Sequence, residues 1–371
     1  TDDAAELVAR KGIDLVIEAM GGVEPARSLI LAAMAGGASV ITANKQLLAQ
    51  DGPTLYEAAA EAGVDLYYEA AVAGAIPIIR PLRESLVGDE VTAVKGIVNG
   101  TTNFILDKMT TEGSSFDEVL AEAQRLGYAE DDPTADVEGL DAAAKAAILA
   151  SLAFHSRVNL DDVDCEGITT VTADDVATAA ELGYVIKLLA RCALAPDNSI
   201  SVGVHPTLVP ANHPLANVSG AFNAVFIESR HAGQLMFMGP GAGGAPTASA
   251  VLGDVITAAR NRVRGVAGPG ESSYSARPVT PRNLVPSRFY VALSVDDEPG
   301  VLAKIAASFA RYQVSIQAVR QESEPGRPLG QGARLAILTH AARVGDMKAA
   351  VEDLAAMPEV TGGITLMRVE G

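Results

Sequence analysis

Short apolar segments alternate with segments of helical periodicity over the first 71 residues. The stretches "GIDLVIEAMGG", "ASVITAN" and "VDLYYEAA" predict buried strands, and the stretches between them, 24–37 and 45–63, predict helices. Pro25 near the start and Gly36 near the end delimit the first of these helices. Continuous apolar strands that alternate with helices indicate a parallel sheet in an α/β domain, which we expect over residues 1–68.

The pattern changes after residue 68. "VTAVKGIVNG", "ISVGVHPTLV" and "NAVFIESRHAGQLMFMG" predict longer strands, mostly antiparallel, mixed with three or four helices. We therefore expect an α+β domain over 69–244. A glycine turn then leads into a helix, 245–262, which we assign to the first domain, and the Gly-, Pro- and Ser-rich segment 263–287 predicts a linker.

The last segment, 288–371, has a compact pattern of its own. "RFYVALSV", "GVLAKIAASFARYQ", "SIQAVRQE", "RLAILTHA", "VGDMKAAVEDLAAM" and "GITLMRVE" follow the order β-α-β-β-α-β. That is the ferredoxin-like order. The predicted fold is thus a partial Rossmann-type parallel sheet, an α+β domain and a ferredoxin-like βαββαβ domain.

Composition removes several classes of function. The chain has 371 residues, 49% of them hydrophobic, and a formal net charge of -18, which argues against nucleic acid as a partner. The two cysteines, Cys165 and Cys192, form neither a disulfide framework nor a metal motif. No apolar run has the length of about 18 residues that a membrane helix needs, and no signal peptide is recognisable. We expect a cytoplasmic protein with no membrane partner.

One lysine stands alone in "EGLDAAAKAAIL". Asp141 lies four residues before Lys145, so both share a helix face with Ile148 and Leu152. An exposed i,i+4 pair contributes only about 0.3 kcal/mol. Here, however, the pair lies on the apolar face, where a charge requires a partner or a function. Spacing alone leaves a surface pair and a catalytic lysine both open. Four carboxylates lie just upstream and could hold a substrate's ammonium group: Glu130, Asp131, Asp132 and Asp136.

Three further stretches allow two interpretations each. "GPGAGG" formally contains GxGxxG, but no strand follows its helix, so it is either a tight turn or a close approach to a phosphate or cofactor ring. "ITANK" ends a buried strand with Asn44 and Lys45, which suits ligand binding or a solvated first turn. "NGTTNFIL" suits either substrate hydrogen bonding or a helix N-cap.

These pieces together resemble homoserine dehydrogenase, an NAD(P)-dependent family that interconverts aspartate 4-semialdehyde and homoserine. The resemblance rests on "TANKQLLA", "YYEAAVAGAIPII", "IVNGTTNFIL", "EAQRLGYAEDDPTADVEGLDAAAKAAIL" and "GPGAGGAPTASAVLGD", in family order over about residues 13–262. The segment from residue 288 resembles an ACT domain, an amino-acid-sensing module.

The resemblance implies roles for individual positions. Lys145 would exchange the proton of the substrate oxygen, and Lys45 would act beside it. The implied substrate-binding residues are Glu130, Asp136, Asp141, Thr101, Thr102, Gly127 and Tyr128. The implied cofactor-binding residues are Thr42, Asn44, Lys45, Gly21, Gly241 and Gly243. A monovalent cation, Na⁺ or K⁺, would be held largely by backbone at Glu69, Val72, Gly74 and Ile76. The implied effector site comprises Asp297, Gly300, Val301, Leu302, Ser315 and Ile316.

The resemblance also implies partners and one departure. The cofactor would be NADP or NAD, threonine would inhibit through the ACT domain, and the chain would form a homodimer or homotetramer. The family opens with a strand and a glycine-rich phosphate-binding turn that do not precede Thr1 here, so we expect an N-terminally truncated copy with weakened cofactor binding and activity. That departure keeps a second hypothesis open, a non-catalytic chain that senses an amino acid.

Overall fold

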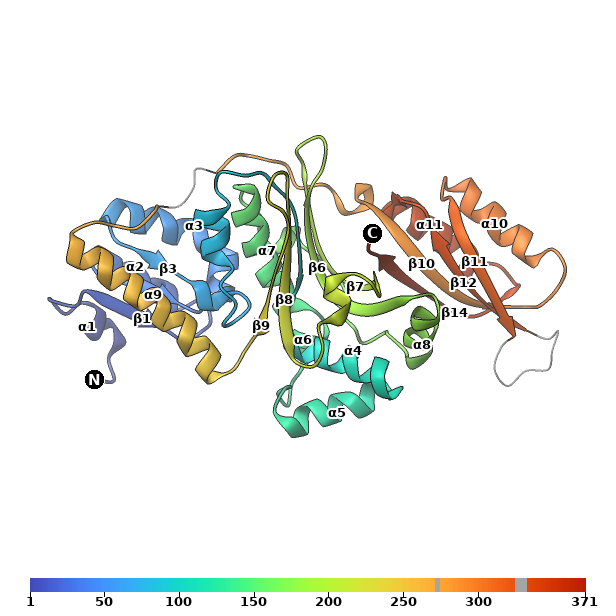
Figure 1. Cartoon of the computed structure of the whole chain (residues 1–371), viewed down its shortest axis with the longest axis horizontal. Coiled ribbons are helices and arrows are strands. Elements are labelled where there is room, and N and C mark those ends of the chain that lie inside the picture. The colour runs from blue at the N-terminus through green and yellow to red at the C-terminus, as the bar shows by residue number, and fades with distance from the viewer. Residues whose placement is uncertain (271–273, 324–331) are drawn as a thin grey trace.

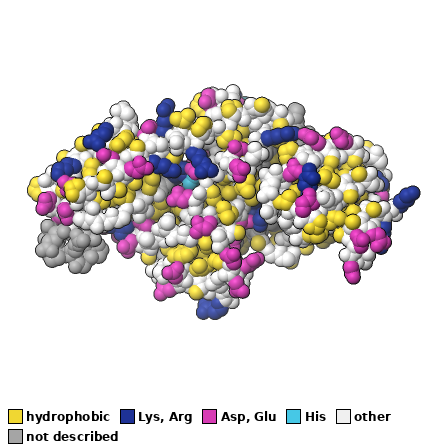
Figure 2. Space-filling view, turned by 180° about the vertical axis from the view of Figure 1, so that it is seen from behind, with side chains coloured by type: hydrophobic (Ala, Val, Ile, Leu, Met, Phe, Trp, Pro, Cys, Tyr) yellow, Lys and Arg dark blue, Asp and Glu magenta, His cyan; other side chains and the backbone are white. Residues whose placement is uncertain are grey.

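The computed structural model describes residues 1–270, 274–323 and 332–371. Three units lie in a row along the longest axis, with the N-terminus in the first unit (Figure 1). The C-terminus lies between the second and third units (Figure 1). Mixed acidic and basic side chains cover the face seen in Figure 2, with apolar patches between them. No helix among the described residues is long and apolar enough to cross a membrane.

The first unit is a parallel sheet in the order β1-β2-β3, with helices packed on it. Its elements are α1 (Ala4–Val8), β1 (Leu15–Glu18), α2 (Ala26–Ala35), β2 (Ser39–Thr42), α3 (Lys45–Ala62) and β3 (Leu66–Tyr67). The distant helix α9 (Gly244–Arg264) packs against this sheet, because Ala258 is buried in one cluster with Ile41 and Tyr67. The expected strand at "VDLYYEAA" is shorter than predicted, because a 3-10 turn, Glu69–Ala71, follows β3 closely.

The second unit is an antiparallel sheet with helices packed on it. Its strands are β4 (Val91–Ile97), β6 (Tyr184–Leu194), β7 (Ile200–Pro210), β8 (Phe222–Ser229) and β9 (Gly233–Pro240). Its helices are α4 (Gly100–Glu112), α5 (Phe116–Leu126), α6 (Thr134–Val137), α7 (Leu140–Phe154) and α8 (Ala173–Glu181). A short strand, β5 (Asp164–Cys165), pairs with β7. Helix α7 packs on β4, β6 and β7 and fills the main core.

The third unit has the predicted ferredoxin-like order. Its elements are β10 (Pro286–Val295), α10 (Val301–Arg311), β11 (Ile316–Ser323), β12 (Ala333–Thr339), α11 (Val344–Ala355) and β14 (Val360–Val369), with a two-residue strand β13 (Ala342–Arg343) before α11. The sheet order is β11-β12-β10-β14, and both helices bury their apolar faces in a separate core cluster.

The second and third units share one sheet, which the sequence did not predict. β14 pairs with β7 in parallel, with Arg368 opposite Thr207 and Val369 opposite Leu208. The described part of the segment expected to be a linker also packs on the second unit, through bridges Ser156↔Ser275 and Ile200↔Val279. Residues 271–273 of that segment lie outside the described residues.

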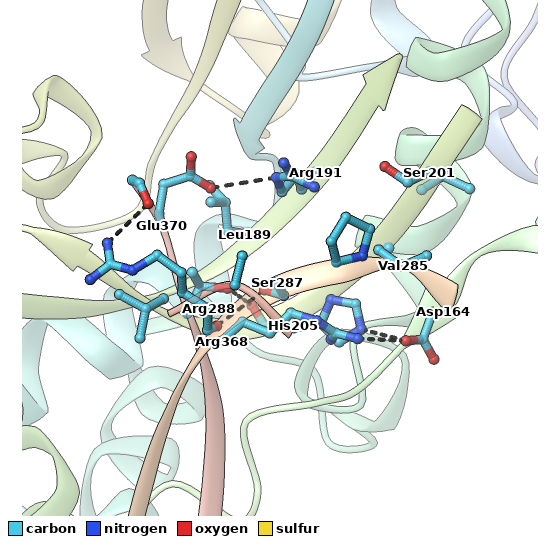
Figure 3. Close-up of a pocket in the computed structure, with 17 residues that line it drawn as sticks. Asp164, Leu189, Arg191, Ser201, His205, Val285, Ser287, Arg288, Arg368 and Glu370 are labelled. Carbon is cyan, nitrogen blue, oxygen red and sulfur yellow. Dashed lines mark hydrogen bonds and ion pairs between the residues drawn. The ribbon is translucent and has the colours of Figure 1, made fainter. Parts of the chain in front are cut away.

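Charged side chains gather where the two units meet, around a cavity of about 320 Å³. His205 on β7 points toward Asp164, with 3.0 Å between Nε2 and Oδ2, and Arg368 donates to the same oxygen at 2.8 Å (Figure 3). At the opposite side, Glu370 forms ion pairs with Lys95 at 2.8 Å and with Arg191 at 3.7 Å. Every one of these charges therefore has a partner across the junction or beside it.

Candidate active site

Helix α7 brings two charged side chains into the core. Its N-cap, Gly139, has a φ of +80°, a left-handed conformation that glycine adopts without strain. The alanine-rich sequence then favours a helix and allows close packing on the sheet. Asp141 and Lys145 are only 9% and 8% exposed, which excludes the interpretation of an exposed surface pair. Ile148 and Leu152 on the same face are buried as well, as predicted.

The Asp141 carboxylate joins two lysines from different units. Its Oδ2 accepts a hydrogen bond from Lys145 Nζ at 2.7 Å, and its Oδ1 lies 2.6 Å from Lys45 Nζ. Lys45 is the first residue of α3 in the first unit, and its side chain is 44% exposed. Lys145 Nζ also donates to the Val98 carbonyl at 2.7 Å, just after β4. One buried carboxylate thus positions two ammonium groups that a reacting oxygen could contact together.

Asp141 stays ionised in this setting. Burial by itself raises the pKa of Asp141, but the charges and hydrogen bonds of Lys145 and Lys45 outweigh burial and hold that pKa well below its ordinary value. The carboxylate therefore remains a negative charge between two cations near neutral pH. It can orient both lysines throughout a reaction without itself taking a proton.

The start of α4 completes the polar side of the site. Asn99 is the N-cap, and its Oδ1 accepts from the Thr102 backbone N–H at 2.9 Å. Its Nδ2 donates to Asp136 Oδ1 at 2.7 Å and to Asp141 Oδ2 at 2.9 Å. Thr101 Oγ1 donates to the Tyr128 carbonyl at 2.6 Å. The N-cap interpretation of "NGTT" is confirmed, and substrate hydrogen bonding by these residues stays a prediction.

These groups surround a cavity of about 730 Å³ between the first and second units. Most of the expected substrate-binding and cofactor-binding residues line it: Lys45, Thr101, Gly127, Tyr128, Glu130, Asp136, Asp141, Lys145, Gly241 and Gly243. Gly74 lines it too. The acidic segment, the two lysines and the glycine turn thus belong to one site.

Four expected residues do not line this cavity. Thr42 donates to Glu18 Oε2 at 2.5 Å, and Gly21 donates its N–H to Glu18 Oε1 at 3.1 Å. Asn44 caps α3 by accepting from the Leu47 N–H at 3.1 Å, and its Nδ2 donates to the Gly22 carbonyl at 2.6 Å. Thr102 is 1% exposed and bonds to Asn99. Their hydrogen bonds hold the ends of β1, β2 and α4, and Ala43 lines the cavity instead.

The glycine turn between β9 and α9 packs closely against its neighbours in the cavity wall. Gly243, the N-cap of α9, has a φ of +113°. A Cβ on Gly241 would lie 2.1 Å from the Asn223 side chain, and a Cβ on Gly74 would lie 2.4 Å from the Gly241 carbonyl oxygen. Side chains at these positions would displace the wall of the cavity, so the glycines allow the turn to line it.

The expected cation-binding turn contains a buried carboxylate. Glu69 Oε1 accepts the backbone N–H groups of Ile78 and Ile79 at 2.6 and 2.7 Å, and Oε2 accepts that of Arg80 at 3.1 Å. Burial raises the pKa of Glu69 despite these bonds. Ala73 and Gly74 both have positive φ, 58° and 60°, and turn the chain sharply. No cluster of His, Cys, Asp and Glu suited to a metal occurs in the described part of the chain, so carbonyl oxygens would supply most ligands.

The expected effector residues fall into two groups in the third unit, one at the start of α10 and one after its end, at the start of β11. Gly300, with a φ of +97°, caps the start of α10, where Val301 and Leu302 form the first turn. Asp297 Oδ1 accepts from Gln321 Nε2 at 3.0 Å, which ties this loop to β11. The Ser315 carbonyl accepts from the His340 N–H at 2.8 Å, just before Ile316 opens β11.

Two groups in the site escaped the sequence analysis as functional candidates. The Val98 carbonyl has no side-chain signal. Asn223 lines the cavity at the start of β8, where nothing in its neighbourhood distinguishes it from any polar strand residue. Their roles depend on elements that meet only in the folded chain.

Known protein families match three consecutive parts of the chain. Residues 1–69 match the homoserine dehydrogenase NAD-binding domain, residues 77–256 match homoserine dehydrogenase, and residues 289–359 match the ACT domain. The homoserine dehydrogenase of Mycobacterium tuberculosis is 55% identical over 378 residues, a match that covers all of this chain and 85% of that protein.

Solved structures agree with the sequence comparison. A homoserine dehydrogenase from Thiobacillus denitrificans superposes with a TM-score of 0.94 at 40% identity, covering all of this chain and 85% of that one. A hyperthermophilic archaeal homoserine dehydrogenase in complex with NADPH matches with a TM-score of 0.62 at 30% identity, covering 73% of this chain and 77% of that one.

Proposed function

The chain belongs to the homoserine dehydrogenase family, oxidoreductases that act on a CH–OH group with a nicotinamide cofactor, and we propose that Lys145, Asp141 and Lys45 carry its reaction. The reaction is the interconversion of aspartate 4-semialdehyde and homoserine, within the synthesis of threonine, methionine and isoleucine. The observation that carries this proposal is the buried Asp141 carboxylate, which accepts from Lys145 and lies 2.6 Å from Lys45 at the wall of one cavity.

The substrate's two ends need different partners. Glu130 and Asp136 line the cavity and attract the substrate's ammonium group, with Thr101, Gly127 and Tyr128 shaping the wall around it. Lys45 and Lys145 lie beyond Asp141 and contact the oxygen that changes between aldehyde and alcohol. The cavity is thus negative at the end that holds the ammonium group and positive at the end that holds the reacting oxygen. These opposite charges orient the substrate with its reacting carbon on the side of the glycine turn.

Lys145 moves the proton. As the aldehyde is reduced, its Nζ gives a proton to the developing alkoxide, and in the reverse direction it takes the hydroxyl proton. Asp141 and the Val98 carbonyl hold Nζ in place, and Lys45 adds a second positive charge next to the oxygen. Bound NAD or NADP supplies the hydride acceptor or donor, and the turn at Gly241 and Gly243 would hold its nicotinamide end.

Replacing Lys145 with alanine tests this proposal. Loss of a positioned general acid lowers a rate by about 100- to 10,000-fold, so we expect kcat for homoserine oxidation to fall by that factor. Steady-state kinetics with NAD and NADP measure it. Lys108→Ala is the matched control, because Lys108 pairs with Glu112 and Glu122 away from the cavity. A Lys145→Ala variant that keeps more than about a tenth of the activity contradicts the assignment.

The unsubstituted protein decides the broader proposal. Homoserine oxidation by the wild type supports the dehydrogenase. No turnover with either cofactor, together with binding of an amino acid, would favour the non-catalytic sensing chain instead.

Three units divide the work in this proposal. Residues 1–68 with helix 245–262 bind the cofactor, residues 69–244 bind the substrate and dimerise, and residues 288–371 regulate, connected by 263–287. Threonine is the effector, with its carboxylate on the backbone N–H groups at the start of α10, near Asp297, Gly300 and Val301. The start of α10, which no described side chain caps, and the left-handed Gly300 support that site.

A monovalent cation and self-association complete the proposal. Na⁺ or K⁺ binds the turn at Glu69, Val72, Gly74 and Ile76, where carbonyl oxygens and one carboxylate suit a hard cation. A melting temperature that is the same in sodium, potassium and choline chloride would contradict that site. Paired ACT domains require a homodimer or homotetramer, and light scattering that gives a monomer would contradict it.

A further inference from the structure

The side-chain amide of Asn223 is buried in the wall of the catalytic cavity without a hydrogen-bond partner. Asn223 is 1% exposed, and neither its Oδ1 nor its Nδ2 bonds to any described residue. Buried amides are almost always hydrogen-bonded, because removal from water without a replacement bond is costly. An amide left in this state next to a ligand cavity therefore points to a bond that forms with the ligand.

Contact with Gly241 shows how the amide is oriented. A Cβ built on Gly241 would lie 2.1 Å from Cγ, 2.1 Å from Nδ2 and 2.4 Å from Oδ1 of Asn223. Nearly equal distances to the three atoms mean that the flat face of the amide lies against Gly241. Hydrogen bonds of an amide lie close to its plane, so the glycine turn covers the face and cannot satisfy the edge.

Asn223 lies at the junction of two sites. Asn223 opens β8, and its side chain lies on the same sheet face as Val225 and Ile227, which pack in the core cluster that contains α7. A Cβ on Gly100, the first residue of α4, would lie 3.5 Å from Asn223 Oδ1. The amide is thus held between the start of α4, on the substrate side, and the glycine turn, on the cofactor side.

We infer that Asn223 binds the carboxamide group of the nicotinamide ring and fixes the rotation of that ring over the substrate. An asparagine edge offers one donor and one acceptor side by side, and a carboxamide offers the matching acceptor and donor. The Nδ2–H donates to the carboxamide oxygen, and Oδ1 accepts from the carboxamide N–H. This inference rests on the proposed dehydrogenase function.

The substrate is a poorer match for the same edge. Its ammonium group only donates and its carboxylate only accepts, so either would leave half of the amide unsatisfied. The acidic segment at Glu130 and Asp136 already provides for the ammonium group. Holding the carboxamide selects which face of the ring meets the substrate, which makes Asn223 a residue that touches the cofactor and positions its reacting carbon.

The test compares the natural cofactor with its 3-acetylpyridine analogue, in which a methyl group replaces the carboxamide NH₂. Dissociation constants are measured by calorimetry, without turnover, on the wild type and on Asn223→Leu. One lost hydrogen bond weakens binding by about five- to tenfold, so we expect the wild type to prefer the natural cofactor by that factor. The leucine side chain has no hydrogen-bond donor or acceptor, so the dissociation constants of the two cofactors should differ by less than about twofold in this variant.

A second variant keeps the inference testable if leucine disturbs the fold. Asn223→Asp has the same shape and keeps the acceptor but not the donor, so both cofactors should bind more weakly while the preference between them remains. Asn212→Asp, an exposed asparagine, controls for the added charge. The KM for homoserine should change by less than about twofold in the Asp variant, because the bond involves the cofactor.

Three results overturn the inference. One is a wild type that binds both cofactors equally, and another is a Leu variant that still discriminates. The third is an Asp variant whose loss appears in the KM for homoserine with unchanged cofactor binding. Failure of the proposed function is a separate result, since a wild type that binds cofactor but does not oxidise homoserine leaves the binding comparison intact.

Discussion

Two buried lysines of the second unit show how the environment of a residue decides its role. Lys187 on β6 is 1% exposed, and its Nζ donates to Asn103 Oδ1 at 3.0 Å and to the Val218 carbonyl at 2.6 Å. Burial lowers the pKa of Lys187 to about 8. It lies away from the cavity and ties α4 to the loop before β8. Lys145, by contrast, meets a carboxylate at a cavity wall, where a reacting oxygen can reach it.

His205 should make the stability of the protein depend on acid. Burial lowers the pKa of His205 from 6.5 to about 4, although the hydrogen bond with Asp164 acts in the opposite direction. Between these two values the unfolded chain binds more protons than the folded chain. Stability from the neutral imidazole is therefore complete above pH 6.5 and is lost as the pH falls toward 4. We expect a loss of about 3 kcal/mol in the free energy of unfolding over this range.

Urea unfolding at several pH values measures this effect. His205→Gln removes the titrating group and should flatten the acid limb, while His340→Gln, an exposed histidine, should leave it unchanged. The low pKa of Asp164 adds a loss only below its ordinary value of 3.8, so the two contributions separate in pH. An acid limb of equal slope in wild type and His205→Gln would show that other groups cause it.

At the scale of elements, the β9–α9 connection matters more than its length suggests. It links the second unit to a helix of the first, and it is packed between Gly74 on one side and Asn223 on the other. Both contacts are too close for a side chain, so the glycines set the position of the cavity wall. The formal GxGxxG pattern therefore reflects close packing rather than the first βαβ unit of a dinucleotide fold.

Gly241→Ala should disturb this wall. Its Cβ would lie 2.1 Å from the Asn223 side chain, so the turn must shift, and we expect cofactor affinity to fall by about tenfold or more. Calorimetric titration with NADP measures the change. Gly253→Ala in α9, the helix that follows the turn, is the matched control, because a Cβ there meets nothing within 4 Å. That control should bind cofactor normally and gain up to about 1 kcal/mol of stability from helix propensity. Equal affinities for the two variants would show that the turn tolerates a side chain.

At the scale of the whole molecule, one continuous sheet connects the second and third units. Glu370, after the last strand, pairs with Lys95 on β4, and both side chains are 9% exposed. Three residues further along the chain the Val98 carbonyl accepts the hydrogen bond of Lys145. We therefore propose that a change in the third unit reaches Lys145 through β4.

Glu370→Gln should weaken this connection. Loss of the charge leaves Lys95 with Glu228 alone, which is 3.0 Å away, so we expect a destabilisation of about 1–3 kcal/mol. Activity without effector should stay within about twofold, while inhibition by threonine should need several-fold more ligand. Inhibition curves and urea unfolding measure the two effects. Glu352→Gln, exposed on α11, is the control. If the Glu370→Gln protein is destabilised but its inhibition curve is unchanged, the Glu370–Lys95 ion pair takes no part in inhibition by threonine.

The sequence alone determined local structure and the polarity of the site. Pro25 and Gly36 flank α2 as predicted, Ser115 and Glu118 form a capping box at the start of α5, and the four-residue spacing of Asp141 and Lys145 gave a shared face. The resemblance to a known family then implied the chemistry, because the matching stretches contain charged residues that packing of a core does not explain. Such features depend on neighbours within about one turn of the chain, which a sequence displays directly.

Only the tertiary structure decided which distant groups meet. The pairing of β14 with β7, the bridge of Asp141 to both Lys145 and Lys45, and the unpaired amide of Asn223 all join segments far apart in the chain. Thr42 and Asn44 had suitable positions at the end of β2, yet hydrogen bonds turn both side chains away from the cavity. Periodicity shows which face of an element is buried but not which partner covers it, because burial lowers the free energy whatever apolar surface does the covering.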